Sequence, residues 1–142
     1  MEVAVIQGGE MMRKEHPKIL AVDDEENFLH LLSHTLQKEG YEVRTALDGP
    51  EALRRLEQEE FDLALIDVRM TPMDGLAVLG DIKRQYPHIK VIMITAYPST
   101  ETRRLSLQKG AVQYLVKPVD IQDLKQTIRQ ALSHLDKGHP KD

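Results

Sequence analysis

Residues 61–79, FDLALIDVRMTPMDGLAVL, carry the pattern on which the fold prediction depends. Residues 63–66 form an unbroken apolar run that ends at Asp67, as expected of a strand buried on both faces of a sheet. A polar loop follows, and Asp74 is placed to cap a helix that continues to about Tyr86. The stretch therefore predicts a buried strand, a loop and a helix in direct succession.

The same succession of a short apolar run and an amphipathic helix recurs along the chain. Alternation of this kind is typical of a parallel sheet with helices on both faces. The near-continuous apolar runs suit central strands, whereas residues 42–46 alternate between polar and apolar side chains and suit an edge. The expected strands are 19–22, 42–46, 63–66, 91–94 and 112–116, and the expected helices are 26–39, 48–59, 74–86, 99–109 and 120–135.

Length and composition limit the classes of protein that remain. The chain has 142 residues, enough for one domain with a sizeable core. Lys and Arg number 19 and Asp and Glu number 23, so the formal charge is −4, which argues against a general nucleic-acid-binding surface. There is no cysteine and no apolar run of the ~20 residues that span a bilayer. We expect a cytoplasmic protein with no membrane segment and no direct nucleic-acid contact.

Residues 1–16 differ from the rest of the chain. They contain Gly8-Gly9 followed by a polar stretch, and we expect a disordered leader there, with an extra edge strand at Val3–Ile6 as the alternative. The domain is expected to cover residues 17–136 and a short tail residues 137–142. We favour a single-domain protein over a piece of a longer one.

Polar side chains stand at the ends of four predicted strands: Asp23-Asp24, Asp67, Thr95 and Lys117. In the strand order 2-1-3-4-5 these four strands are neighbours, so the side chains converge on one pocket. Crowded carboxylates call for a cation, and hard oxygen ligands suit Mg²⁺. A carboxylate can also attack phosphorus, with a lysine and a hydroxyl stabilising the phosphoryl oxygens. An aspartate at a strand end is often only a helix cap, but the joint pattern favours phosphoryl transfer onto a carboxylate.

Four segments resemble the response-regulator receiver domains of two-component signalling, especially those of enhancer-binding transcription activators. The segments are ILAVDDEENFLHLL, FDLALIDVRMTPMDGLAVL, VIMITAY and GAVQYLVKPVD, and the resemblance extends over Pro17–Asp136. It implies the flavodoxin-like (βα)5 fold, an α/β architecture with a doubly wound, five-stranded parallel sheet in the order 2-1-3-4-5.

The resemblance also implies roles for individual residues. Asp67 would be the phosphoacceptor. Asp23 and Asp24 would bind Mg²⁺ together with Asp67 and the backbone carbonyl of Arg69.

Further roles follow from the same resemblance on the last two strands. Thr95 would bind the phosphoryl group and act as a switch. Lys117 would pair with the phosphoryl group. Tyr114 would be the switch aromatic, with a half-buried strand tyrosine as the alternative. The Lys117–Pro118 peptide bond would be cis.

The function implied is a phosphorylation-activated signalling module that is not an enzyme beyond its own phosphotransfer and dephosphorylation. A sensor histidine kinase or a phosphotransfer protein would supply the phosphoryl group. Phosphorylation would rearrange the face formed by residues 99–109, 112–116 and 120–135. A downstream protein, an output domain or a second copy of the chain would then bind that face.

The chain departs from the family's pattern at a few positions. Thr71 and Pro72 stand where the family usually has Pro and Gly, so the loop shape is expected to differ. Arg69 and Tyr97 flank the phosphate entrance, which predicts slow dephosphorylation. A phosphohydrolase of the aspartyl-phosphate type would need an aspartate at the position of Arg69.

Two further classes remain as alternatives. A degenerate receiver that serves only as a binding scaffold is disfavoured by the complete set of site residues. A flavin-binding protein of similar topology would need a phosphate-cradling loop rich in Ser, Thr or Gly after the first strand, whereas this chain has Asp-Asp-Glu-Glu.

Overall fold

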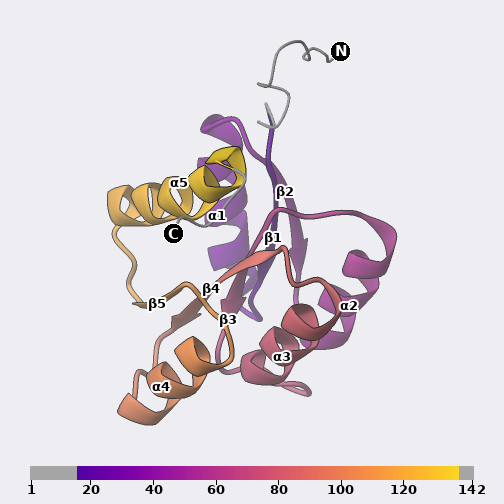
Figure 1. Cartoon of the computed structure of the whole chain (residues 1–142). Coiled ribbons are helices and arrows are strands. Elements are labelled where there is room, and N and C mark those ends of the chain that lie inside the picture. Colours follow the sequence, from indigo (N-terminus) through magenta and orange to yellow (C-terminus); the bar gives the residue numbers. More distant parts are fainter. Residues whose placement is uncertain (1–15, 138–142) are drawn as a thin grey trace.

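Five parallel strands form one sheet in the order β2-β1-β3-β4-β5 (Figure 1). The computed structural model describes residues 16–137, so the predicted leader, including its alternative strand at Val3–Ile6, and residues 138–142 lie outside the described residues. The strands are β1 (Lys18–Val22), β2 (Glu42–Ala46), β3 (Leu63–Asp67), β4 (Lys90–Thr95) and β5 (Gln113–Val116). The helices are α1 (Glu26–Lys38), α2 (Gly49–Gln58), α3 (Gly75–Gln85), α4 (Thr100–Gln108) and α5 (Ile121–Lys137). The predicted flavodoxin-like topology is confirmed.

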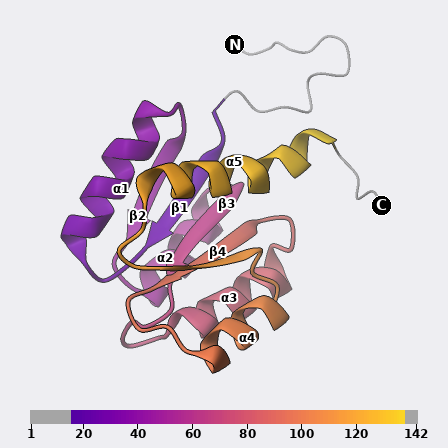
Figure 2. The same ribbon diagram turned by 90° about the vertical axis from the view of Figure 1, so that its left-hand side faces the viewer.

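Helices cover both faces of the sheet. α1 and α5 lie on one face, and α2, α3 and α4 lie on the other (Figures 1 and 2). Successive side chains of β1 point to opposite faces of the sheet. Ile19 and Ala21 pack with α1 and α5, whereas Leu20 and Val22 pack with α2 and α3. Because the central strands are buried on both faces, they appear in the sequence as continuous apolar runs.

Side chains cap α2 and α3, the latter at Asp74 as the sequence predicts. Asp48 and Asp74 accept hydrogen bonds from the backbone amides of Glu51 and Ala77, at 2.8 and 2.9 Å. The Glu51 carboxylate accepts in return from the amide of Leu47 at 2.8 Å. These caps fix where the β2–α2 and β3–α3 loops end.

The loop between β3 and α3 returns tightly beneath the end of β3. The amide of Gly75 donates to the carbonyl of Val68 at 2.8 Å. A Cβ atom at Gly75 would lie 2.0 Å from the backbone oxygen of Asp67, which is an impossible contact. The Thr71–Pro72 peptide bond in this loop is cis. Glycine at position 75 is therefore required by the close approach of two backbone segments.

No helix within residues 16–137 combines the length and the apolar character that crossing a membrane requires.

Two glycines of α3 give a matched test of this packing. We expect Gly75→Ala to lower the free energy of unfolding by about 2–4 kcal/mol, because the new methyl group meets fixed backbone. Gly80 has nothing within 4 Å of its added Cβ, so Gly80→Ala is expected to raise that free energy by about 0.5–1 kcal/mol. Urea unfolding followed by circular dichroism measures both. Equal stability of the two variants would contradict the packing described for the loop.

Candidate functional site

Three carboxylates meet at the carboxyl edge of the sheet. Asp23 and Asp24 follow β1, and Asp67 is the last residue of β3, the strand next to β1. One oxygen from each lies within 4.8 Å of the others. Asp23 and Asp67 are buried, with 1% and 7% of their surface exposed, whereas Asp24 is exposed. The convergence that strand order predicted for these side chains is present in the structure.

The electrostatics of the cluster disfavour full ionisation. Burial raises the pKa of Asp67 to about 6, and the neighbouring charge of Asp23 adds to the effect. Burial also raises the pKa of Asp23, although a hydrogen bond from Lys117 partly offsets the change. A positive charge placed among the three carboxylates would relieve this repulsion.

The ammonium of Lys117, the residue directly after β5, supplies one such positive charge. It donates hydrogen bonds to Asp23 at 2.8 Å and to Glu25 at 2.7 Å. It also lies 4.3 Å from the centre of the Phe28 ring. Burial of the ammonium favours a lower pKa, but the hydrogen bonds to the two carboxylates outweigh burial and raise the pKa of Lys117.

Sequence reasoning missed both Glu25 and Phe28 at this site. The position of Glu25, directly after the acidic pair, was the available signal. The spacing of Phe28 gave only its place on the apolar face of a helix.

Thr95 and Tyr114 lie on the neighbouring strands β4 and β5, where Tyr114 is paired with Met93, two positions before Thr95. Thr95 is fully buried at the end of β4, and its hydroxyl oxygen accepts from the amide of Tyr97 at 2.9 Å. Tyr114 is buried on β5, and its hydroxyl group lies 2.6 Å from that of Thr102 on α4. The amide of Ser99 also donates to the Tyr114 hydroxyl oxygen, at 3.3 Å. The side chain of Tyr114 is thus buried, and its hydroxyl group is bonded to residues at the start of α4.

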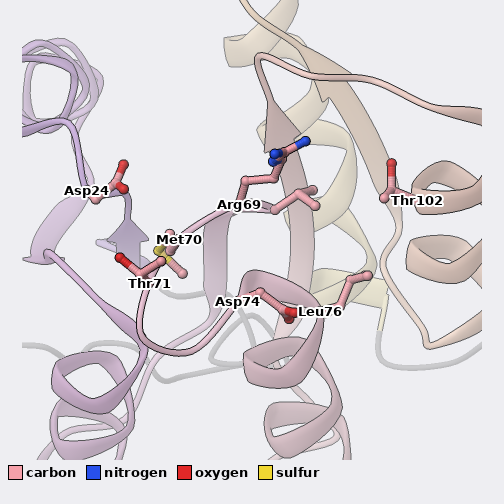
Figure 3. Close-up of a pocket in the computed structure, with 8 residues that line it drawn as sticks. Asp24, Arg69, Met70, Thr71, Asp74, Leu76 and Thr102 are labelled. Carbon is pink, nitrogen blue, oxygen red and sulfur yellow. The ribbon is translucent and has the colours of Figure 1, made fainter.

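A cleft of about 470 Å³ adjoins the acidic cluster. Figure 3 shows Asp24 and Thr102 on opposite sides of it, with the β3–α3 loop between them. The Arg69 guanidinium lies 4.8 Å from the centre of the exposed Tyr97 ring, so these two side chains stack beside the site. The lining residues are Asp24, Val68, Arg69, Met70, Thr71, Asp74, Leu76 and Thr102.

The donor atoms of the cluster fit Mg²⁺. Carboxylate oxygens are the hard ligands that this ion prefers, and Mg²⁺ sites typically use one or two carboxylates, water and a phosphate. The three residues of the cluster, Asp23, Asp24 and Asp67, offer only such oxygens.

The Lys117–Pro118 peptide bond, which precedes α5, is cis.

This combination of a doubly wound sheet with an acidic cluster, a threonine and a lysine at its carboxyl edge is typical of a signalling domain. A model of the family described as the response regulator receiver domain matches residues 19–129. The chain belongs to this family and is a receiver domain of two-component signalling.

Relatives and solved structures agree with that assignment. The transcriptional regulatory protein ZraR of Escherichia coli K12 is 42% identical over 123 residues, which are 87% of this chain and 28% of ZraR. A CheY-like receiver domain structure from Methanospirillum hungatei has a TM-score of 0.84 at 37% identity and covers 87% of this chain and 99% of that one. NtrX of Brucella abortus gives a TM-score of 0.80 at 32% identity, over 86% of this chain and 28% of NtrX. The chain therefore spans just over a quarter of ZraR and of NtrX.

The raised pKa of Asp67 gives a prediction for stability against pH. Between the ordinary value of 3.8 and about 6, the folded protein holds a proton on Asp67 that the unfolded chain releases, so this residue's contribution to stability falls as pH rises. In EDTA we expect Asp67→Asn to be more stable than the wild type above pH 6, by an amount on the order of 1–3 kcal/mol. Urea unfolding should show this gain shrinking toward pH 4. The exposed Glu57→Gln serves as the control, and an equal gain there would argue against crowding as the cause.

Proposed function

We propose that Asp67 accepts a phosphoryl group from a phosphohistidine of a sensor histidine kinase or a phosphotransfer protein. The proposal takes residues 17–136 as the receiver domain. The observation that carries it is the burial of Asp67 close to two further carboxylates, one of which, Asp23, accepts a hydrogen bond from the Lys117 ammonium. Such an arrangement provides a nucleophile together with the charges that a transferring phosphoryl group needs.

In the proposed transfer, a carboxylate oxygen of Asp67 forms a bond to phosphorus while the phosphorus–nitrogen bond of the donor breaks. The electron pair of that bond goes to the departing imidazole nitrogen. Asp23, Asp24, Asp67 and the backbone carbonyl of Arg69 are the proposed ligands of Mg²⁺, which when bound supplies positive charge to the phosphoryl oxygens.

Thr95 and Lys117 complete the proposed site. Thr95, whose hydroxyl oxygen accepts from the Tyr97 amide, would donate its own hydroxyl hydrogen to a phosphoryl oxygen. Lys117 would pair with another oxygen.

The new phosphoryl group would then switch the face formed by α4, β5 and α5. The phosphorylated side chain of Asp67 would carry roughly −1.5 to −2 charges, by analogy with other phosphorylated residues, in place of the single charge of the carboxylate. Thr95 would move toward the new phosphoryl oxygens. Tyr114, whose hydroxyl group is hydrogen-bonded to that of Thr102 on α4, would transmit this movement to the helix. Leu107, Val112 and Val116 expose apolar surface on or beside these elements. A downstream protein, an output domain or a second copy of the chain would bind there.

The alternatives receive less support from the same residues. A phosphorylation-independent scaffold would not require this buried acidic cluster with its lysine partner. A phosphohydrolase would need an acid or base where Arg69 stands, so we propose no enzymatic activity beyond self-directed phosphotransfer and dephosphorylation. We also propose a cytoplasmic location, in keeping with relatives that are named as transcriptional regulatory proteins.

Phosphorylation by a small donor tests the proposal directly. After incubation with acetyl phosphate and Mg²⁺, we expect intact-mass spectra to show one phosphoryl adduct. The adduct should disappear in EDTA and in Asp67→Ala, and it should remain in Asp81→Asn, which removes a carboxylate of α3 that pairs with Arg84 outside the cluster. A purified histidine kinase, autophosphorylated with ATP, is the second donor. No adduct from either donor, or an adduct that survives in Asp67→Ala, would refute the proposal.

The stacked pair of Arg69 and Tyr97 predicts the lifetime of the phosphorylated form. A guanidinium and a ring at the entrance exclude water from the phosphoryl group, so the wild type should lose its adduct slowly. We expect Arg69→Ala and Tyr97→Ala each to speed this loss several-fold. The decay of the adduct mass after removal of the donor measures the rate. A wild-type lifetime of seconds would contradict the prediction.

A further inference from the structure

Phe28 makes a contact with Lys117 that its place on α1 does not require. The Lys117 ammonium lies 4.3 Å from the centre of the Phe28 ring, within the range of a favourable cation–π interaction. The lysine side chain is 12% exposed, so water screens this contact only weakly. Phe28 itself is partly buried at the rim of the core cluster shared by α1 and α5.

The ammonium is held from several directions at once. Two of its three N–H groups are directed to Asp23 and Glu25, at 2.8 and 2.7 Å, and the ring of Phe28 lies against it. A lysine side chain otherwise loses up to about 2 kcal/mol of rotamer entropy when it is fixed in one place. Because these contacts already fix the Lys117 side chain, this entropy is lost before any phosphoryl group arrives. One N–H group of the ammonium remains for a phosphoryl oxygen.

We propose that Phe28 is a positioning residue for phosphotransfer, which acts by holding the Lys117 ammonium against Asp23 in the acidic cluster that contains Asp67. The inference rests on the proposed function, because it concerns the lysine that is proposed to pair with the phosphoryl group. Phe28 does not touch the reacting atoms. Its ring face fixes the cation that does, together with the carboxylates of Asp23 and Glu25.

A packing role for Phe28 predicts a different pattern of variants. Phe28→Leu keeps an apolar side chain but removes the ring face, whereas Phe28→Tyr keeps the ring face. The chain offers a matched control, because its other phenylalanine, Phe61, also has a lysine near its ring: Lys18, at 5.8 Å. Phe61→Leu removes a buried ring away from the site and tests whether loss of core packing alone slows the reaction.

The first measurement is NMR spectroscopy of the full chain. We expect the ε-methylene protons of Lys117 to be shifted upfield by the ring current in the wild type and in Phe28→Tyr, and to return to ordinary values in Phe28→Leu. Absence of the upfield shift in the wild type would overturn the inference whether or not the protein is phosphorylated.

The second measurement is the rate of phosphorylation at increasing acetyl phosphate concentration, with saturating Mg²⁺. Phe28→Leu should lower the maximal rate constant about three- to tenfold, the loss that a partly desolvated cation–π contact accounts for. Phe28→Tyr and Phe61→Leu should stay near the wild type. In a Lys117→Met background, where the cation is absent, Phe28→Leu should have no further effect.

The outcomes separate this inference from the proposed function. A wild type that no donor phosphorylates refutes the proposed function. A wild type that is phosphorylated, with Phe28→Leu at an unchanged rate, overturns only the role of Phe28. An equal loss in Phe28→Leu and Phe28→Tyr, or a loss that persists in Lys117→Met, assigns Phe28 to packing and also overturns the inference.

Discussion

Two buried carboxylates, Asp23 and Asp67, stand beside an exposed third, Asp24, at an edge of the sheet that the parallel topology itself creates. Their mutual repulsion is strong because little water reaches the two buried groups, and the pKa of Asp67 rises to about 6 as a result of burial first and charge second. Lys117 offsets part of this repulsion from the position directly after β5, the strand two places beyond β3, and it lies 94 residues from Asp23 in the sequence. The ion pair between Lys117 and Asp23 links the ends of β5 and β1 across the site. Removing one partner of such a buried pair destabilises a protein, because the other charge is left buried and unpaired.

The fold accommodates this charged edge by making its surroundings rigid. Asp67 ends a strand whose every residue is buried, so its position follows from the core. Beneath it the chain turns so closely that only Gly75 fits against the backbone of Asp67, and the Asp74 cap then starts α3. The loop between them, free of regular structure, lines the cleft beside the acidic cluster (Figure 3). The carboxylate of Asp67 therefore lies where a buried strand ends and the cleft-lining loop begins.

Most of this arrangement could be predicted from the sequence, because local rules determine it. Apolar runs indicated strands whose observed ends differ by a residue at most, and cap residues indicated where helices begin. Strand order then brought Asp23, Asp67 and Lys117 together. The partners of Lys117 could not be predicted in the same way. Phe28 satisfies helical periodicity whether or not an ammonium lies over its ring, and that contact depends on how α1 sits against a strand end 89 positions later in the chain. The stacking of Arg69 on Tyr97 likewise joins two separate loops.

The link from the site to the outer face runs through a short polar segment. Thr95 is bonded to the amide of Tyr97, and Ser99 and Thr102 are bonded to the hydroxyl of Tyr114, so hydrogen bonds occur at both ends of the stretch that joins β4 to α4. α4 itself is lightly anchored: among the side chains that the structure describes, only Ser106 of this helix is buried, and its hydroxyl has no hydrogen-bond partner. A helix with so little apolar burial is the element whose position a small change in free energy can alter. Under the proposed function, a charge change at Asp67 would therefore move α4 more readily than α1 or α3, which each pack three buried aliphatic side chains against the sheet.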